Sequence, residues 1–312
     1  MDPVTHGLTG ALLAETGFAQ RFGRQARLAM IGGALAPDID VLWSARESVF
    51  ALETHRGITH SFVGGLGVAL AVALVVRFLG PEKRWGPLVG MSYLGLLLGH
   101  LFLDLITPYG IQLFLPFSNA RPAWDLVFIL DPFQTIPILL VLLVAWLNPG
   151  VGARTARLGV LYLAAYFAFM AVNHSVVLHR VEAAARAEGL SPVEAAALPQ
   201  PFRPFEWLAL VETPEVIGRG VVRLLTSEPL TFERIPRAPR NGLVQRVENL
   251  PAVRTYLWFA RFPVVTIRQE NGRQIVEYQD LHFPDRPRGR PLFRLRVFVN
   301  GQGEVEEVSF GR

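Results

Sequence analysis

The chain has 312 residues, of which 51% are hydrophobic, and its mean hydropathy is +0.33. Soluble domains are about 45–50% apolar even when glycine is counted, so this composition indicates a membrane protein. The chain has no cysteine, which excludes thiolate metal sites, disulfides and cysteine nucleophiles. Its net charge of +4 is small and almost wholly carried by arginine, so no nucleic-acid partner is expected.

The first 40 residues predict a helical hairpin with a basic tip. Residues 3–19 and 27–36 are apolar with small residues interspersed, and Arg21, Arg24 and Arg27 mark the turn between them. The chain begins without the basic region and cleavage site of a secretory signal peptide, so no cleaved signal is expected.

Four long apolar runs follow, at about residues 61–79, 88–106, 126–147 and 158–178. Each is close to the roughly 20 residues that a spanning helix needs. We therefore expect residues 1–180 to form a mainly α, polytopic membrane domain with about four spanning helices and the N-terminal hairpin.

The distribution of basic residues predicts the orientation, because cytoplasmic loops collect Lys and Arg. The hairpin tip, the 77–84 turn and the 150–157 turn are all basic and would lie on the cytoplasmic side. Six of the seven histidines would then lie at the extracytoplasmic side, namely His6, His55, His60, His100, His174 and His179.

Glycines recur in the second apolar run, at Gly86, Gly90, Gly95 and Gly99. Small residues at such spacing let helix backbones approach closely in lipid. The alternative is that they are ordinary filler of a membrane helix.

The last part of the chain has a different character and predicts a small α+β soluble domain over residues 228–312. Alternating strands flank Asn271-Gly272 and Asn300-Gly301, which are hairpin turn signals. Residues 181–227 would form a helical or interfacial connector: residues 191–194 read as a helix start. Its aromatic residues would lie at the lipid interface; they are Phe202, Phe205 and Trp207.

His100 and Asp104 are four residues apart inside an apolar run. On a helix they project from the same face and could grip one cation. Ionisable groups inside membrane segments are costly, so they usually serve a function. A histidine bonded to a carboxylate for purely structural reasons is the alternative.

The other candidate ligands lie near the same predicted level, and the set as a whole is His6, Asp38, Asp40, His55, His60, His100 and Asp104. Histidine and carboxylate ligands suit zinc, manganese or iron, and the set is large enough for one or two ions. Taken singly, each has a plain structural alternative: the two aspartates could form a turn and a helix cap, and the two histidines of residues 55–60 could be loop residues.

A bound divalent metal would make hydroxide available for attack on a phosphoryl or carbonyl group. Asp38, Asp40 or Asp104 could bridge ions or take the proton of the water. Arg56 would suit a bidentate grip on a phosphate, although a salt bridge or an interfacial position would explain it equally well. We leave open whether Asp131, His174 and His179 join the site; Asp131-Pro132 also fits a helix start.

One family shares an ordered series of motifs with this chain: Thr5-His6-Gly7, Pro37-Asp38-Ile39-Asp40, His55-Arg56-Gly57-Ile58-Thr59-His60-Ser61, Gly99-His100 to Asp104, and Asp131-Pro132. Over residues 1–180 the chain resembles the bacterial membrane-bound metal-dependent hydrolases, also described as LexA-regulated inner-membrane hydrolases. More remotely it is similar to the zinc-dependent phospholipase C and P1 nuclease class. That resemblance implies phosphoester hydrolysis, with Asp38, His60, His100 and Asp104 as metal ligands and His6 on a second ion.

The sequence thus predicts an inner-membrane, metal-dependent hydrolase of a phosphoester in a lipid or head-group-like substrate. The metal site and the C-terminal domain would both be extracytoplasmic. A metal-binding transporter or sensor, and a structural membrane protein whose polar cluster holds helices together, are the alternatives. The oligomeric state is left open.

Overall fold

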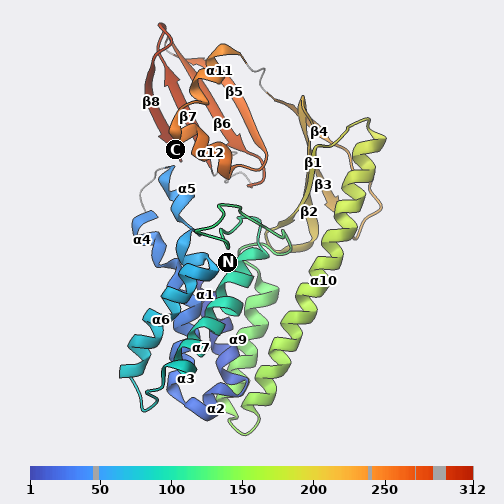
Figure 1. Ribbon diagram of the computed structural model, residues 1–312. Helices are drawn as coiled ribbons and strands as arrows, with labels where there is room; N and C mark the ends of the chain where they lie inside the picture. Colours follow the sequence, from blue (N-terminus) through green and yellow to red (C-terminus); the bar gives the residue numbers. More distant parts are fainter. Residues whose placement is uncertain (45–48, 238–240, 271, 284–292, 312) are drawn as a thin grey trace. The chain divides into compact units, whose positions relative to one another are not determined.

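The computed structural model describes residues 1–44, 49–237, 241–270, 272–283 and 293–311 (Figure 1). The chain forms two compact units. The first comprises Met1–Val41, Arg56–His174 and Pro199–Pro204. The second comprises Leu42–His55, Ser175–Leu198 and Phe205–Arg312.

The first unit is a helical bundle. Its helices in chain order are α1 (Pro3–Glu15), α2 (Phe18–Phe22), α3 (Arg24–Leu35), the 3₁₀ turns η1 (Ala36–Asp40) and η2 (Ile58–His60), α6 (Phe62–Phe78), α7 (Trp85–Leu96), the π-helical turn η3 (Leu97–Leu101), α8 (Phe102–Leu105), α9 (Pro132–Leu147) and α10 (Gly152–Ala187), which continues into the second unit.

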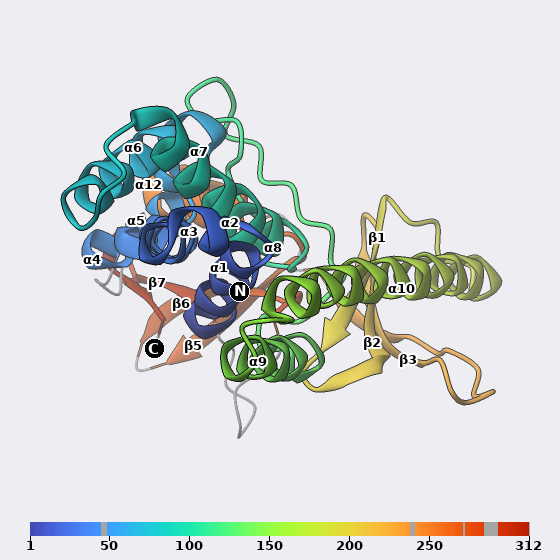
Figure 2. The same cartoon turned by 90° about the horizontal axis from the view of Figure 1, so that it is seen from below.

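The N-terminal hairpin forms as the sequence predicts. The Asp2 carboxylate accepts the Thr5 backbone N–H at 3.0 Å, and Pro3 occupies the first turn, so α1 has a capped start. Helix α1 contacts both α3 and α9, and α3 in turn contacts α7 (Figure 2). The hairpin is therefore the centre of the bundle.

Glycines allow α3 and α7 to pack at very short range. A β-carbon added to Gly33 would lie 2.0 Å from the Ser92 carbonyl oxygen, and one added to Gly95 would lie 2.3 Å from that of Met30. Of the glycines expected to pack, Gly95 and Gly99 do so, whereas no heavy atom lies within 4 Å of the β-carbon position of Gly86 or Gly90.

The structure does not confirm the four membrane spans that we expected. Two helices among the described residues are long and apolar enough to cross a membrane, Trp85–Leu105 and Gly152–Ala187. Phe50–His60 and Phe62–Phe78, bent by 67°, would make a third if they form one broken span. Helix α9 has 16 residues and is about 24 Å long, less than the roughly 30 Å of a hydrocarbon core, because Asp131 caps it five residues after the predicted start of its run.

Large apolar side chains stay exposed along α6, α9 and α10; they include Leu66, Leu70, Leu74, Leu139, Leu143, Leu158, Leu161 and Val172. A continuous apolar exterior of this kind suits contact with lipid.

The three basic turns lie at one end of this bundle, as the orientation argument requires (Figure 1). The Gln25 amide nitrogen donates to the carbonyl oxygens of Val76 and Glu82, which ties α3 to the α6–α7 turn. The Arg157 side chain donates to the Thr16 carbonyl oxygen at 2.8 Å, which ties α10 to the end of α1. We call this end of the first unit the basic end.

The second unit holds two four-stranded sheets. The first has the order β1 (Glu194–Gln200), β2 (Arg203–Glu212), β3 (Val216–Arg223) and β4 (Glu233–Pro236). The second has the order β5 (Pro263–Glu270), β6 (Arg273–Asp280), β7 (Arg294–Val299) and β8 (Val305–Phe310). Short helices accompany them: α4 (Val41–Ser44), α5 (Phe50–Thr54), α11 (Gly242–Val247) and α12 (Pro251–Phe259).

Both predicted hairpins are confirmed. Strands β5 and β6 pair antiparallel across residues 271–272, with Glu270 opposite Arg273, and β7 pairs with β8 across residues 300–304. The connector prediction was wrong in two respects. Residues 191–194 lead into strand β1 rather than a helix, because pairing with β2 overrides the local capping signal. Trp207 is fully buried in β2 and belongs to the core, not to a lipid interface.

The close crossing of α3 and α7 generates a testable prediction. Gly95→Ala should lower the stability of the protein by roughly 1–3 kcal/mol, because the new methyl group would collide with a backbone carbonyl. Gly90→Ala, in the same helix but facing open space, is the matched control and should be neutral or slightly stabilising. Thermal unfolding of both variants in detergent measures the difference, and equal stabilities would contradict the crossing.

Candidate metal centre

Five ionisable side chains from separate elements converge at the end of the bundle opposite the basic end. His6 comes from the first turn of α1, Asp38 from η1, His60 from η2, His100 from η3 and Asp104 from α8. The three histidines are fully buried, Asp104 is 1% exposed and the Asp38 side chain is 25% exposed. The cluster is therefore closed on most sides and accessible at Asp38.

Four imidazole–carboxylate separations in this cluster are nearly equal. His60 Nε2 is 3.4 Å from Asp38 Oδ1 and 3.6 Å from Asp104 Oδ2. His100 Nε2 is 3.6 Å from Asp38 Oδ1 and 3.5 Å from Asp104 Oδ2. Ligands about 2.0–2.1 Å from a tetrahedral metal ion are roughly 3.4 Å apart, so these separations suit one such ion. We call these four residues the four-ligand group.

The two Nε2 atoms of the four-ligand group are 2.9 Å apart. His100 Nδ1 donates to the Ala34 carbonyl oxygen at 2.6 Å, since a carbonyl only accepts. His60 Nδ1 faces the Thr59 hydroxyl at 3.0 Å and the Asp40 carboxylate at 3.4 Å, and a carboxylate also accepts. In both neutral rings the lone pair is then on Nε2. Two such lone pairs facing each other repel unless a cation lies between them.

His6 and Asp104 complete the cluster. His6 Nδ1 donates to the Gly99 carbonyl oxygen at 2.8 Å, so its Nε2 also carries a lone pair, and that atom is 3.4 Å from Asp104 Oδ1. Among the described residues, neither His6 Nε2 nor Asp104 Oδ2 has a hydrogen-bond partner, although both are buried. Buried polar atoms are ordinarily satisfied, so these two are candidate ligand atoms.

The geometry supports one ion better than two. His6, His100 and Asp104 form one possible metal-binding group, and Asp38, His60 and His100 form another. Both use His100, whose single Nε2 lone pair can serve one ion. Two ions would therefore need a ligand beyond these two groups.

Asp40 and Arg56 lie behind the ligands rather than among them. Asp40 is buried, accepts the Arg56 backbone N–H at 2.9 Å and faces the Nδ1 side of His60. Arg56 has a positive φ of 57° and is 4% exposed. Its guanidinium is 2.9 Å from Asp104 Oδ1, donates to the Thr107 hydroxyl at 3.1 Å and stacks over the Tyr109 ring. The salt-bridge alternative for Arg56 is thus what the structure contains.

Asp38, the partly exposed residue of the cluster, carries a negative charge. Burial raises the pKa of Asp38, but the neighbouring His60 and His100 rings lower it by more, so the pKa lies well below its ordinary value. Asp38 is therefore an anion at neutral pH.

The remaining predicted positions lie elsewhere. His55 follows α5 in the second unit and belongs to neither possible metal-binding group. His174 and His179 on α10 belong to neither group as well. Asp131 caps α9 and accepts a hydrogen bond from the Tyr166 hydroxyl at 2.6 Å. It therefore has the helix-start role that the sequence offered as an alternative to a site role.

Sequence reasoning missed two buried polar residues. Thr107 orients Arg56, and it follows Asp104 by three residues, a spacing that could have pointed to it. Gln134 in α9 is fully buried, and neither atom of its side-chain amide has a hydrogen-bond partner among the described residues. A glutamine within an apolar run is the only signal that the sequence offered.

Among the comparisons with known proteins, the family match covers the helical N-terminal part of the chain. Residues 1–177 match the YdjM inner membrane protein family. The uncharacterized protein YfhP of Bacillus subtilis (strain 168) is 28% identical over 140 residues, which are 43% of this chain and 42% of YfhP, so the match spans less than half of that relative.

No solved structure matches the chain, and these comparisons give no support to the remote resemblance to phospholipase C and P1 nuclease. The family match covers more than half of the chain and includes all five clustered side chains. The chain therefore belongs to the YdjM inner membrane protein family.

Proposed function

We propose that this protein is a membrane-bound, metal-dependent hydrolase whose ion is held by the four-ligand group. The observation that carries the proposal is the set of four imidazole–carboxylate separations of 3.4–3.6 Å, together with the 2.9 Å approach of two Nε2 lone pairs. A shared proton could also separate two imidazoles. Asp38 Oδ1 and Asp104 Oδ2 each lie 3.4–3.6 Å from both Nε2 atoms, so the site offers four ligand atoms, which favours a divalent cation over a proton.

The ligand atoms of the four-ligand group limit which metal ions would bind. Two imidazole nitrogens and two carboxylate oxygens suit zinc, and manganese or iron would also accept them. The Nδ1 contacts of His60 and His100 fix each ring with Nε2 directed at the cluster, which is the arrangement that metal-binding histidines usually have.

The bound metal would supply a water of lowered pKa and a charge that polarises the scissile group. The chain's own residues have separate roles in the proposal. Asp38 borders the open side and would meet the attacking water. His6 Nε2, with its free lone pair, would accept the proton. Arg56 holds Asp104 in place, and Asp40 orients His60.

The substrate that fits this position is a phosphoester in a lipid head group. The cluster lies at the ends of membrane helices, where head groups are found, and the apolar exterior of the bundle places acyl chains beside it. If the basic end is cytoplasmic, as the positive-inside rule predicts, the metal site opens on the extracytoplasmic side.

Metal content tests the four-ligand group directly. The purified wild-type protein should contain about one divalent ion per chain, and His60→Gln should lose most of it, because a ligand nitrogen is removed while side-chain bulk is kept. His179→Gln, which replaces an exposed histidine outside the group, is the control and should keep the full amount. Elemental analysis of the three proteins gives the answer, and metal retained in full by His60→Gln would refute the assignment.

Hydrolysis needs its own test. Wild-type protein in nanodiscs should release product from a panel of phospholipids and soluble phosphoesters, lose this activity with a chelator and regain it with zinc or manganese. His60→Gln should be inactive throughout. Stoichiometric metal without any product, combined with metal flux in proteoliposomes, would instead favour a transporter.

The orientation can be measured because the chain has no cysteine. Ser118→Cys, at an exposed position in the segment between α8 and α9, should react with a membrane-impermeant maleimide in intact spheroplasts. Arg84→Cys, in an exposed basic turn, should react only after lysis. The opposite labelling pattern would place the metal site in the cytoplasm.

A further inference from the structure

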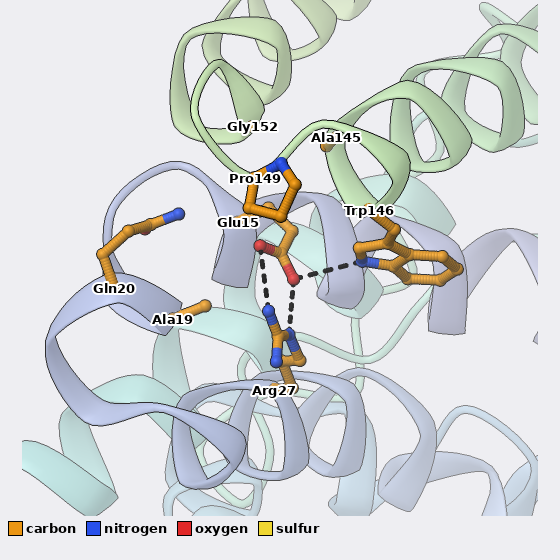
Figure 3. Close-up of a pocket in the computed structure, with 8 residues that line it drawn as sticks. All are labelled: Glu15, Ala19, Gln20, Arg27, Ala145, Trp146, Pro149 and Gly152. Atoms are coloured by element: carbon orange, nitrogen blue, oxygen red, sulfur yellow. Dashed lines mark hydrogen bonds and ion pairs between the residues drawn. The ribbon is translucent and has the colours of Figure 1, made fainter.

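A second pocket lies at the basic end of the first unit, opposite the metal cluster. It has a volume of about 570 Å³, within the range of roughly 300–1,000 Å³ typical of ligand sites. Its lining residues come from the α1–α3 hairpin and the α9–α10 turn (Figure 3); they are Glu15, Ala19, Gln20, Arg27, Ala145, Trp146, Pro149 and Gly152. Glu15, Ala19 and Ala145 are buried and form the floor, whereas Gln20, Trp146 and Pro149 are exposed and form the rim.

A fixed ion pair shapes the floor. Glu15 is 3% exposed, and Arg27 Nε donates to its Oε1 at 2.5 Å while Nη2 donates to Oε2 at 3.3 Å. The Trp146 indole N–H also donates to Oε1, at 3.2 Å (Figure 3). Three donors thus hold the carboxylate, and the carboxylate in turn holds the guanidinium in one orientation.

The guanidinium keeps binding capacity. The Arg27 side chain is 45% exposed, and its contacts with Glu15 use Nε and Nη2. The Nη1 edge can therefore donate to a ligand. Because Glu15 already fixes the side chain, little conformational entropy would be lost when Arg27 binds.

The surroundings carry an excess of positive charge. The Arg157 guanidinium binds the Thr16 carbonyl and lies 3.4 Å from the β-carbon position of Gly17, in the turn beside the pocket. Arg21 and Arg24 line a neighbouring pocket on the same hairpin. Glu15 and Arg27 neutralise each other, so the excess positive charge comes from Arg157, Arg21 and Arg24. The ligand that suits this region is an anion, and arginine favours phosphate geometry.

The rim is apolar on its membrane side. Trp146 is 50% exposed, and Leu143 and Leu147 on the same helix are 49% and 70% exposed. Tryptophan at the end of an apolar helix is typical of the membrane interface. A ligand in this pocket would therefore have a phosphate beside Arg27 and hydrocarbon beside α9.

We propose that this pocket binds the phosphate group of an anionic phospholipid, with Arg27 as the binding residue, Glu15 as the residue that positions it and Trp146 as the contact for the glycerol and first acyl carbons. The site is separate from the metal cluster and does not depend on the proposed hydrolysis. Free phosphate shares the same polar chemistry, but the exposed apolar rim favours a lipid.

The test is lipid rebinding to the delipidated protein, followed by native mass spectrometry with phosphatidylglycerol, phosphatidylcholine and inorganic phosphate as separate probes. Wild-type protein should prefer phosphatidylglycerol. Glu15→Gln/Arg27→Gln should bind it about tenfold more weakly, because charge-assisted hydrogen bonds are lost. This double variant leaves the net charge unchanged, so a loss cannot be attributed to a general electrostatic effect.

Glu82→Gln/Arg84→Gln is the matched control. It removes a second Glu–Arg pair at the basic end, with exposed Arg84 bound to Glu82 at 2.7 Å, and should bind phosphatidylglycerol like wild type. Equal losses in both double variants, or wild-type binding by Glu15→Gln/Arg27→Gln, would overturn the proposal. Full displacement of phosphatidylglycerol by millimolar inorganic phosphate would show that the site recognises free phosphate instead.

A rim substitution keeps the proposal testable if the double variant fails to fold. Gln20→Glu adds a negative charge at an exposed position and should weaken phosphatidylglycerol binding through repulsion, with no effect on thermal unfolding. Ser118→Asp changes the net charge equally at an exposed position outside the pocket and should leave binding unchanged. Identical binding by the two variants would contradict the assignment.

Discussion

The Asp104 carboxylate is the group on which the rest of the first unit depends. It is 1% exposed inside an apolar bundle, where an unpaired charge would cost several kcal/mol. Its Oδ1 contacts the Arg56 guanidinium, His6 and the amino group of Met1, and its Oδ2 faces His60 and His100. These partners come from separate elements, so one buried charge fixes where the ends of several helices meet.

Backbone packing makes this arrangement possible. The His100 ring is held by the carbonyl of Ala34 on α3, and the His6 ring by the carbonyl of Gly99. Both bonds need helix backbones that nearly touch. Gly33 and Gly95 provide that approach between α3 and α7, and Gly10 provides it between α1 and α3, where an added β-carbon would lie 2.7 Å from the Met30 carbonyl oxygen. The close crossings thus hold the imidazoles as well as the fold.

Much of this arrangement could be predicted from the sequence, because the sequence records polarity and spacing. Ionisable residues at the ends of apolar runs predicted the cluster, and the asymmetry of arginines predicted that the basic turns share one end. Both hairpins of the second sheet followed from Asn-Gly turn signals. The role of each residue within the cluster could not be predicted from the sequence. Asp40 and Asp38 are identical in kind and two residues apart, and only the 3₁₀ turn that holds both determines which one faces His100.

Long-range packing explains the errors. The run expected at 126–147 is apolar from its beginning, but Asp131 begins α9 late because its carboxylate accepts both the Phe133 N–H and the Tyr166 hydroxyl. Residues 191–194 carry a local helix signal, but the segment leads into β1, which pairs with β2 from further along the chain. Trp207 was placed at an interface from its type and neighbours, whereas sheet pairing buries it. Each case depends on a partner distant in sequence.

The π-helical turn η3 lets one helix both pack closely against α3 and position side chains of the metal cluster. Its i→i+5 hydrogen bonding accommodates one extra residue in the turn. Gly95 in α7 and His100 in η3 are five residues apart, and both face α3. The turn offsets by one residue the positions that face α3. Before it, small residues allow contact between helix backbones; after it, side chains are placed for metal binding. A single inserted residue in an ancestral helix would be enough to create such a shift, and a single deletion would rotate His100 and Asp104 away from the other three side chains while leaving the apolar pattern of the span intact.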